Sequence, residues 1–100
     1  MAQAIHKYML HDVQNVVKLP KDWLVLSVHN QRGYICLWVL VDTEEKETES
    51  VLFYAFGTGE TPIHLDPVSC VFVGTVLLEE GELVFHVFYD AVPIVDSGIR

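Results

Sequence analysis

Apolar and polar residues alternate along most of this chain in the pattern of β-strands. The clearest stretch runs from Trp23 to Asp42, WLVLSVHNQRGYICLWVLVD, where two apolar runs flank a short polar connection at residues 30–33. Both runs are rich in Val, Ile, Leu, Trp and Tyr, and both are too short and too β-branched to favour a helix. Gly33 closes the connection and can take the positive φ that a tight hairpin loop demands. The stretch therefore predicts a central β-hairpin.

The two strands of this hairpin differ in how their faces are expected to pack. Side chains alternate with period two, so the first strand should present two faces: Leu24, Leu26 and Val28 on one, and Trp23, Val25, Ser27 and His29 on the other. In the second strand both faces are apolar, with Ile35, Leu37, Val39 and Val41 on one side and Tyr34, Cys36, Trp38 and Leu40 on the other. Since neither face suits water, we expect both faces of the second strand to be covered.

Further apolar runs extend the strand pattern at residues 5–10, 13–19, 51–56, 69–78 and 83–89. Lys7 and Lys18, in the first two runs, are charges of the kind that protect edge strands. Gly74 interrupts the fourth run, which indicates a β-bulge or the close approach of another backbone. Gly81 provides the turn between the last two runs. About seven short strands without a helical periodicity predict an all-β fold, either a small antiparallel sandwich or a barrel.

The length of 100 residues indicates a single domain, 1–100, with a core at residues 4–89 and a C-terminal tail at 90–100. The tail contains Pro93 and is expected to fray, the alternative being an arm that crosses onto a neighbouring subunit. The loop at residues 60–68 contains two prolines and is the best candidate for a mobile or ligand-facing segment.

The composition leaves more apolar surface than a small domain needs. Hydrophobic residues make up 51% of the chain, and the mean hydropathy is +0.32. A small domain has a large surface relative to its core, so this value is high. We infer that apolar surface is left for a partner, and a second copy of the chain is the simplest one. The sequence therefore predicts a homo-oligomer.

The charge and the lack of targeting signals argue against nucleic-acid binding, membrane insertion and secretion. The formal charge is −8 and only six residues are basic, so a protein that binds the phosphate backbone of nucleic acids is disfavoured. The apolar runs fall well short of the ~20 residues of a membrane helix, and the N-terminus lacks a signal-peptide pattern. We expect a protein of the cytoplasm, that of the host cell if it is viral, which binds neither nucleic acid nor membrane.

No arrangement of residues indicates catalysis. Cys36 and Cys70 are not a C-x-x-C pair, so both are expected to be reduced thiols in the core. The five histidines show no zinc-binding spacing, and no Ser, Cys or carboxylate stands in a nucleophile motif. The sequence therefore predicts a protein that is not an enzyme, with no catalytic residue, no metal site and no cofactor.

Four residues are candidates for binding an anion. Gly57, Thr58 and Gly59 could present backbone N–H groups as an anion-binding nest, although a plain turn at the end of a strand is the alternative. Arg32, at the tip of the central hairpin, could bind a phosphate or a carboxylate through two parallel hydrogen bonds. An ordinary exposed loop charge is the alternative for Arg32.

Two further candidates lie within strands. Trp38 could stack on a planar ring, and packing in the core is the alternative for an aromatic residue in a strand. His86 shares a strand face with Val84 and Phe88, where a histidine is either a ligand-binding group or a satisfied core or interface residue.

Two acidic segments supply a different candidate surface. Residues 42–50, DTEEKETES, hold five acidic residues and one Lys, and residues 79–82 are Glu-Glu-Gly-Glu. Their ordinary role is that of a solvated loop and a solvated turn. The alternative is docking on a basic protein surface through Glu44, Glu45, Glu47, Glu79 and Glu80.

Several separated segments resemble one family. They are the N-terminal I-x-K-Y, the central LSVHNQRGYICLWVLVD, then YAFGTGE, and finally FVGTVLLEEGELVFHVF. This combination resembles a set of small uncharacterised proteins of bacteria and their tailed viruses, in which CLW-x-LVD, GTG and IGT…LVFHVF segments recur in this order. The resemblance covers most of residues 5–89. Two departures are Glu60, where the family often has His, and the continuation beyond Phe88.

The resemblance implies a domain of unknown function carried by phages, and hence a role against a host system. We expect a non-enzymatic phage-type accessory protein that counters host defence by sequestering a small anionic, nucleotide-like ligand in an oligomer, in pockets between subunits. The alternative is an acidic inhibitor that imitates nucleic acid and binds a host nucleic-acid-binding protein.

Overall fold

The computed structural model describes residues 2–60, 65, 66 and 68–94. These residues form seven β-strands and one short 3₁₀ turn, η1, in the order β1 Gln3–Leu10, β2 Gln14–Pro20, β3 Leu24–Gln31, β4 Tyr34–Asp42, β5 Thr48–Gly57, β6 Cys70–Leu78, η1 Glu79–Gly81 and β7 Leu83–Asp90. The predicted all-β class and the predicted strands are therefore confirmed. The predicted loop at residues 60–68 lies largely outside the described residues.

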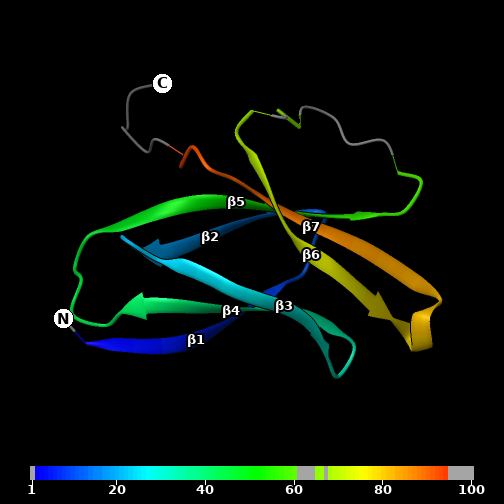
Figure 1. Ribbon diagram of the computed structural model, residues 1–100, viewed down its shortest axis with the longest axis horizontal. Coiled ribbons are helices and arrows are strands. Elements are labelled where there is room, and N and C mark those ends of the chain that lie inside the picture. Colours follow the sequence, from blue (N-terminus) through cyan, green and yellow to red (C-terminus); the bar gives the residue numbers. More distant parts are fainter. Residues whose placement is uncertain (1, 61–64, 67, 95–100) are drawn as a thin grey trace.

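The strands form two antiparallel sheets packed as a sandwich (Figure 1). Sheet A has the order β1-β4-β3, and sheet B has the order β2-β5-β7-β6. Of the two expected architectures, the sandwich is the one observed, and the sheets do not close into a barrel. β1 and β2 are edge strands, as the placement of Lys7 and Lys18 predicted.

The core lies between the inner faces of the two sheets. From sheet A, β4 contributes its buried residues Ile35, Leu37, Val39 and Val41. From sheet B come the buried residues Val17, Leu19, Val51, Phe53, Ala55 and Val87. The predicted alternation along β4 is confirmed, since these inward residues are separated by the outward Tyr34, Cys36, Trp38 and Leu40. Hydrophobic burial between two such faces is the main favourable term for a fold of this size.

The predicted faces of β3 are wrong. A β-bulge between Val25 and Ser27 inserts one extra residue, so the strict alternation shifts partway along the strand. Val25 packs against the core and Val28 is buried, whereas Leu24 and Leu26 are 56% and 46% exposed. The bulge thus separates Leu24 and Leu26 from Val28, with which they were predicted to share a face.

Gly74 lies at a second bulge, on β6. The pairing of β6 with β7 shifts between Phe72 and Gly74, as the sequence predicted. A Cβ atom at Gly74 would lie 3.0 Å from Cγ1 of Val28 on β3, so this glycine also allows a close approach between the sheets. The side chain of Asn30 continues this contact, since its Nδ2 donates to the carbonyl of Leu77 at 3.1 Å. β3 and β6 therefore meet along one side of the sandwich.

Backbone hydrogen bonds hold the described part of the tail. The amide of Ala91 donates to the carbonyl of Ser69 at 2.7 Å, and the amide of Ile94 donates to that of Ser50 at 2.8 Å. The chain thus runs beside β5 as far as Ile94. The remaining tail, residues 95–100, lies outside the described residues. Within the described ranges there is no helix with the length and apolar character needed to cross a membrane.

The buried face of β2 provides a test of this packing. Leu19 is fully buried between the sheets, so Leu19→Ala should lower the free energy of unfolding by about 2–5 kcal/mol through lost burial and a residual cavity. The matched control Leu24→Ala, on the exposed face of β3, should cost less than about 1 kcal/mol. Urea unfolding measures both variants, and equal losses would contradict the assignment of the inner faces.

Candidate functional site

The sandwich leaves two apolar sheet faces outside its core. On sheet A the strand register puts Ile5, Lys7, Met9, Leu24, Tyr34, Cys36, Trp38 and Leu40 on the outer face. On sheet B it puts Val16, Leu52, Tyr54, Phe56, Phe72, Leu77, Val84, His86 and Phe88 on the outer face. Since the core lies between the sheets, these two faces point in opposite directions.

The outer face of sheet A has its own packed layer of side chains. Cys36 points outward from β4, yet it is fully buried. Its register partners are Met9 on β1 and His29 on β3. The imidazole of His29 meets the ring of Trp38 edge to face, with centroids 5.9 Å apart. The prediction of a buried Cys36 thiol is confirmed, but the burial comes from neighbours on the outer face and not from the core.

A hollow opens at the hairpin end of this face, with a volume of about 370 Å³, and we call it the cationic hollow. It is lined by Lys7, Met9, Gln31, Arg32 and Tyr34. The strand register brings Lys7 and Met9 of β1 beside the hairpin of β3 and β4. Nζ of Lys7 donates to Oε1 of Gln31 at 2.7 Å, which fixes one side of the hollow.

Local turn geometry places Arg32 in this hollow. Arg32 and Gly33 both have positive φ, 54° and 88°, which is the conformation of the two-residue turn that matches the twist of a hairpin. Oδ1 of Asn30 accepts a hydrogen bond from the amide of Gly33 at 2.8 Å and stabilises the turn. The turn therefore holds Arg32 at the mouth of the hollow beside Tyr34, whose side chain is exposed.

The charge of the hollow is opposite to that of the chain. The formal net charge is −8, but the hollow contains two cations and no carboxylate. Among the described residues, no carboxylate forms an ion pair with Lys7 or Arg32, whereas Lys21 is paired with Glu47 at 3.1 Å. Two cations without acidic partners, next to an amide and an exposed phenol ring, form a surface suited to a small anion that carries a planar group.

The outer face of sheet B carries a row of aromatic rings, and we call it the aromatic face. Tyr54 and Phe56 are stacked with centroids 5.6 Å apart. Phe88 lies 6.4 Å from Phe56 and 5.3 Å from Phe72, in tilted and edge-to-face arrangements. The row crosses β5, β7 and β6, so it ties three strands together on their outer side.

His86 lies on this face between two threonine hydroxyls. Its Nε2 is 2.7 Å from Oγ1 of Thr58, and its Nδ1 is 3.1 Å from Oγ1 of Thr75. A hydroxyl can both donate and accept, so the two threonines satisfy the imidazole in either tautomer. The predicted face of His86, shared with Val84 and Phe88, is confirmed by the strand register.

The turn at Gly57–Gly59 already holds an anion of its own chain. The amide of Gly57 donates to the carboxylate of Glu60, and the amide of Thr58 donates to the carbonyl of Val84 at 3.1 Å. A ligand at the predicted nest would have to displace Glu60. The nest therefore remains a prediction, and the Glu60 carboxylate of the same chain would compete with any ligand there.

The predicted ligand-binding residues fall into two groups. Arg32 and Trp38 are both on sheet A, whereas Gly57, Thr58, Gly59 and His86 gather on sheet B, where Thr58 and His86 are in contact. One copy of the chain does not bring the six together.

Sequence reasoning missed Lys7, Gln31 and Tyr34 of the cationic hollow, and it interpreted Lys7 only as an edge charge. Lys7 could be placed in the hollow only from the pairing of β1 with β4, which no local sequence motif indicates.

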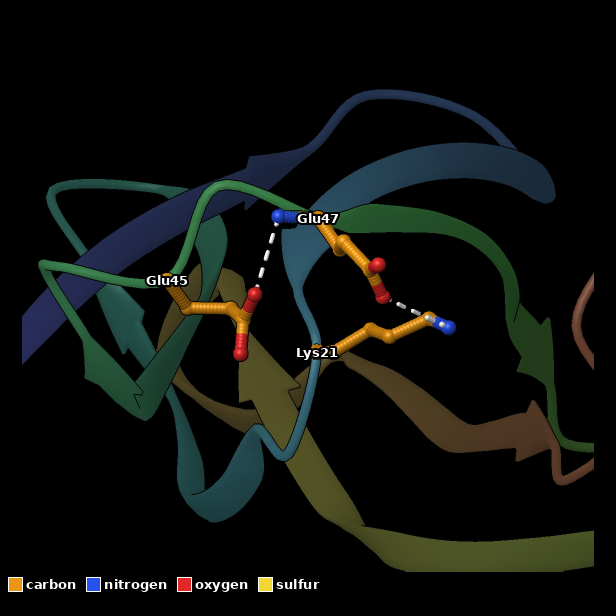
Figure 2. A network of polar contacts seen from close by, with 3 residues as sticks. All are labelled: Lys21, Glu45 and Glu47. Carbon is orange, nitrogen blue, oxygen red and sulfur yellow. Dashed lines mark hydrogen bonds and ion pairs between the residues drawn. The ribbon is translucent and has the colours of Figure 1, made fainter.

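The predicted acidic surface is divided between two places. The β4–β5 loop with Glu44, Glu45 and Glu47 lies at one end of the molecule, and η1 with Glu79 and Glu80 lies at the other (Figure 1). Loop contacts also engage some of these side chains. Figure 2 shows Glu47 paired with Lys21, while its amide donates to the carboxylate of Glu45 at 3.0 Å. The two segments therefore do not form one continuous acidic surface in a single copy.

One loop carboxylate has a structural role that the sequence did not indicate. Oε2 of Glu49 accepts a hydrogen bond from Nε1 of Trp23 at 2.9 Å. The ring of Trp23 packs edge to face on Tyr89, with centroids 5.0 Å apart, at the border of the core. β5 begins at Thr48, so this end of the predicted loop belongs to a strand.

The described residues contain two cysteines, and their potential metal-ligating side chains are not clustered. Cys36 and Cys70 are both free, but Cys70 is only half-buried on the outer face of sheet B, so its prediction as a core thiol is wrong. Within the described ranges, no group of three or more His, Cys, Asp or Glu side chains lies close enough together to hold a metal ion.

A family comparison agrees with the resemblance seen in the sequence. The model of a domain of unknown function, DUF7352, matches residues 1–96. The chain belongs to this family. No curated protein and no solved structure matches the chain significantly. Membership of DUF7352 thus brings no known activity to either outer face, and the function has to be argued from their geometry.

Asp42, at the end of β4, provides a pH-dependent test of the loop. Its Oδ1 accepts hydrogen bonds from the amides of Glu44 at 3.0 Å and Ala2 at 3.2 Å, and these bonds lower the pKa of the Asp42 carboxyl. Folding therefore favours the carboxylate, so its stabilisation is present above the unfolded pKa of about 3.9 and is lost as the pH falls through the folded value. Asp42→Asn should unfold more easily than the parent at pH 7, and the difference should close below about pH 4.

Urea unfolding at pH 7 and across the acidic range measures this difference. Glu82→Gln, which makes the same change of charge beyond η1 at the other end of the molecule, serves as the control. A gap between Asp42→Asn and the parent that stays constant down to pH 2 would count against the role of these hydrogen bonds.

Proposed function

We propose that this protein is a non-enzymatic binding protein that sequesters a small anionic, nucleotide-like ligand in the cationic hollow of sheet A. The observation that carries the proposal is the meeting of Lys7 and Arg32 in one hollow, without an acidic partner among the described residues, in a chain of net charge −8. Each neighbour in the hollow has a chemistry that such a ligand needs.

The guanidinium of Arg32 binds a phosphate through two parallel N–H bonds, and Lys7 adds a second positive charge. The exposed ring of Tyr34 offers a flat surface for a base, and Gln31 offers an amide next to it. A volume of about 370 Å³ lies within the range of small-molecule sites, which is ~300–1,000 Å³. A long nucleic acid is a poorer fit, because the rest of the acidic chain repels an extended phosphate backbone.

The composition of the hollow favours binding over catalysis. Its lining consists of two cations, an amide, a thioether and a phenol. Nucleophilic and acid–base catalysis most often use Ser, Cys, His or a carboxylate, and this lining contains none of them. Of the two lining groups that can transfer a proton, Lys7 and Tyr34, Lys7 already donates to Gln31. Retention of the ligand by charge and stacking is the chemistry that these groups support.

The biological role proposed here is that of a phage accessory protein in the host cytoplasm. Resemblance to families carried by tailed viruses supports it. Binding a nucleotide signal without converting it would remove that signal from a host defence pathway, provided that the protein is abundant and holds the ligand tightly. The exposed apolar faces support self-association of the chain. The result would be an oligomer in which each copy holds a ligand.

The acidic inhibitor is the weaker alternative. Its two segments lie at opposite ends of the molecule, and Glu47 is paired within the chain. A nucleic-acid mimic presents a continuous row of negative charge, and the two acidic segments do not form such a row in the part of one copy that the structure describes.

A calorimetric titration tests the ligand and its site together. The parent protein is titrated with a panel of mononucleotides, cyclic dinucleotides and inorganic phosphate, and one or more nucleotides should bind. Arg32→Gln and Lys7→Gln should each weaken the binding of that nucleotide by about 10-fold or more, because each removes a charge-assisted hydrogen bond. Lys46→Gln removes the same charge from the β4–β5 loop and should leave the affinity unchanged.

Two results would contradict the proposal. One is the absence of binding by every member of the panel, together with no nucleotide released when the freshly purified protein is denatured. The other is nucleotide binding that Arg32→Gln and Lys7→Gln leave intact.

A further inference from the structure

We propose that the aromatic face of sheet B is the surface on which a second copy of the chain docks, giving a two-fold dimer. This inference rests on the self-association included in the proposed function and names the surface that carries it. The dimer leaves the cationic hollow on the opposite side of each copy, so ligand binding and dimerisation are separable.

The first observation is exposed apolar area across the whole face. Val16, Phe72 and Leu77 are 62%, 55% and 55% exposed, and they come from both edge strands of sheet B. Half-buried aromatic and aliphatic residues fill the strands between them: Leu52, Tyr54, Val84 and Phe88. Aromatic residues are enriched in the centres of protein interfaces.

The second observation is the near absence of charge. The chain has 14 acidic residues, but among the described outward-facing residues of sheet B only Lys18 and Asp90 carry full charges. Burial raises the pKa of the Tyr54 hydroxyl, and the nearby Asp90 and Cys70 add to this effect. Burial also raises the pKa of the Cys70 thiol, to which Asp90 and Asp66 contribute. Both groups are therefore neutral at pH 7. The other described acidic residues lie in turns and loops, except for Asp42 at the end of β4 and Glu49 on β5. Two copies of net charge −8 can therefore meet on this face with Asp90 as the only outward-facing carboxylate of sheet B among the described residues.

The third observation is that the histidine within the face has its hydrogen-bond partners in the same chain. Both ring nitrogens of His86 are in contact with threonine hydroxyls of the same chain, Thr58 and Thr75. A polar side chain that has its partners within the chain can be covered by an apolar surface without the cost of a lost hydrogen bond. This arrangement suits a buried interface.

The size of the face matches the need of a dimer. Four strands about 4.8 Å apart and about nine residues long cover a footprint of roughly 600 Å². Side chains stand out from this footprint, so its accessible area is larger and approaches the ~800 Å² that each partner buries in an ordinary specific interface. Two such faces can pack at about 10 Å with the strands inclined by about 30°, as the two sheets of one sandwich do.

A second copy is the occupant that these observations favour. A neutral apolar face is complementary to itself, and a two-fold axis presents the same face from both partners. A basic partner protein would instead be drawn to the acidic ends, and a nucleic acid would be repelled.

Sedimentation velocity of the purified full chain from about 1 to 100 μM tests the inference. The parent should sediment with twice the chain mass of 11.4 kDa at the upper concentrations. Phe72→Glu places a charge on the proposed interface and should give a monomer with an unchanged far-ultraviolet circular dichroism spectrum. Ile5→Glu, at the matched exposure of 57% on the outer face of sheet A, should remain a dimer.

Leu77→Glu, elsewhere on the same face, provides a second disruptive variant if Phe72→Glu does not fold. A parent that is monomeric at 100 μM overturns the inference, and so does a dimer that Ile5→Glu dissociates while Phe72→Glu and Leu77→Glu leave it intact. Nucleotide titration of the same variants separates the two proposals. A monomeric Phe72→Glu that still binds nucleotide supports both, and a dimeric parent that binds none leaves the dimer standing while it contradicts the proposed function.

Discussion

The structure depends on one constraint, which is that β4 is apolar on both of its faces. Its inner side chains close the core against sheet B, and its outer side chains need cover of their own. The neighbouring strands provide part of that cover, and as a result Cys36 is fully buried although it points outward. The pairing of β1 with β4 also sets the geometry of the cationic hollow, because it brings Lys7 and Met9 beside the tip of the hairpin.

The two outer faces share an origin but differ in chemistry. Both sheets are apolar outside, which follows from a composition that exceeds what a small core can absorb. Sheet A combines this surface with two cations at one end, whereas sheet B has aromatic rings and an internally satisfied histidine. The two proposals accordingly assign the retention of a small anion to one face and the contact between two copies to the other.

Sequence reasoning predicted the strands well because period-two alternation, edge lysines and turn glycines are local signals. Gly74 could even be assigned to a bulge. The bulge of β3 was missed, since no glycine or proline accompanies Leu26 as a local signal. The cationic hollow was only partly anticipated: Arg32 was a candidate and Tyr34 is its neighbour in the hairpin, but Lys7 joins the hollow through the pairing of β1 with β4. Likewise, only the three-dimensional arrangement shows that Glu60 occupies the amide of Gly57.

Native mass spectrometry of the freshly purified protein tests the central claim most directly, since it reports the number of subunits and any retained ligand in one spectrum. The account predicts a dimer, at twice the chain mass of 11.4 kDa, with an additional mass that corresponds to a small anionic compound in each copy. A folded, ligand-free monomer that gains no mass when nucleotides are added would contradict it.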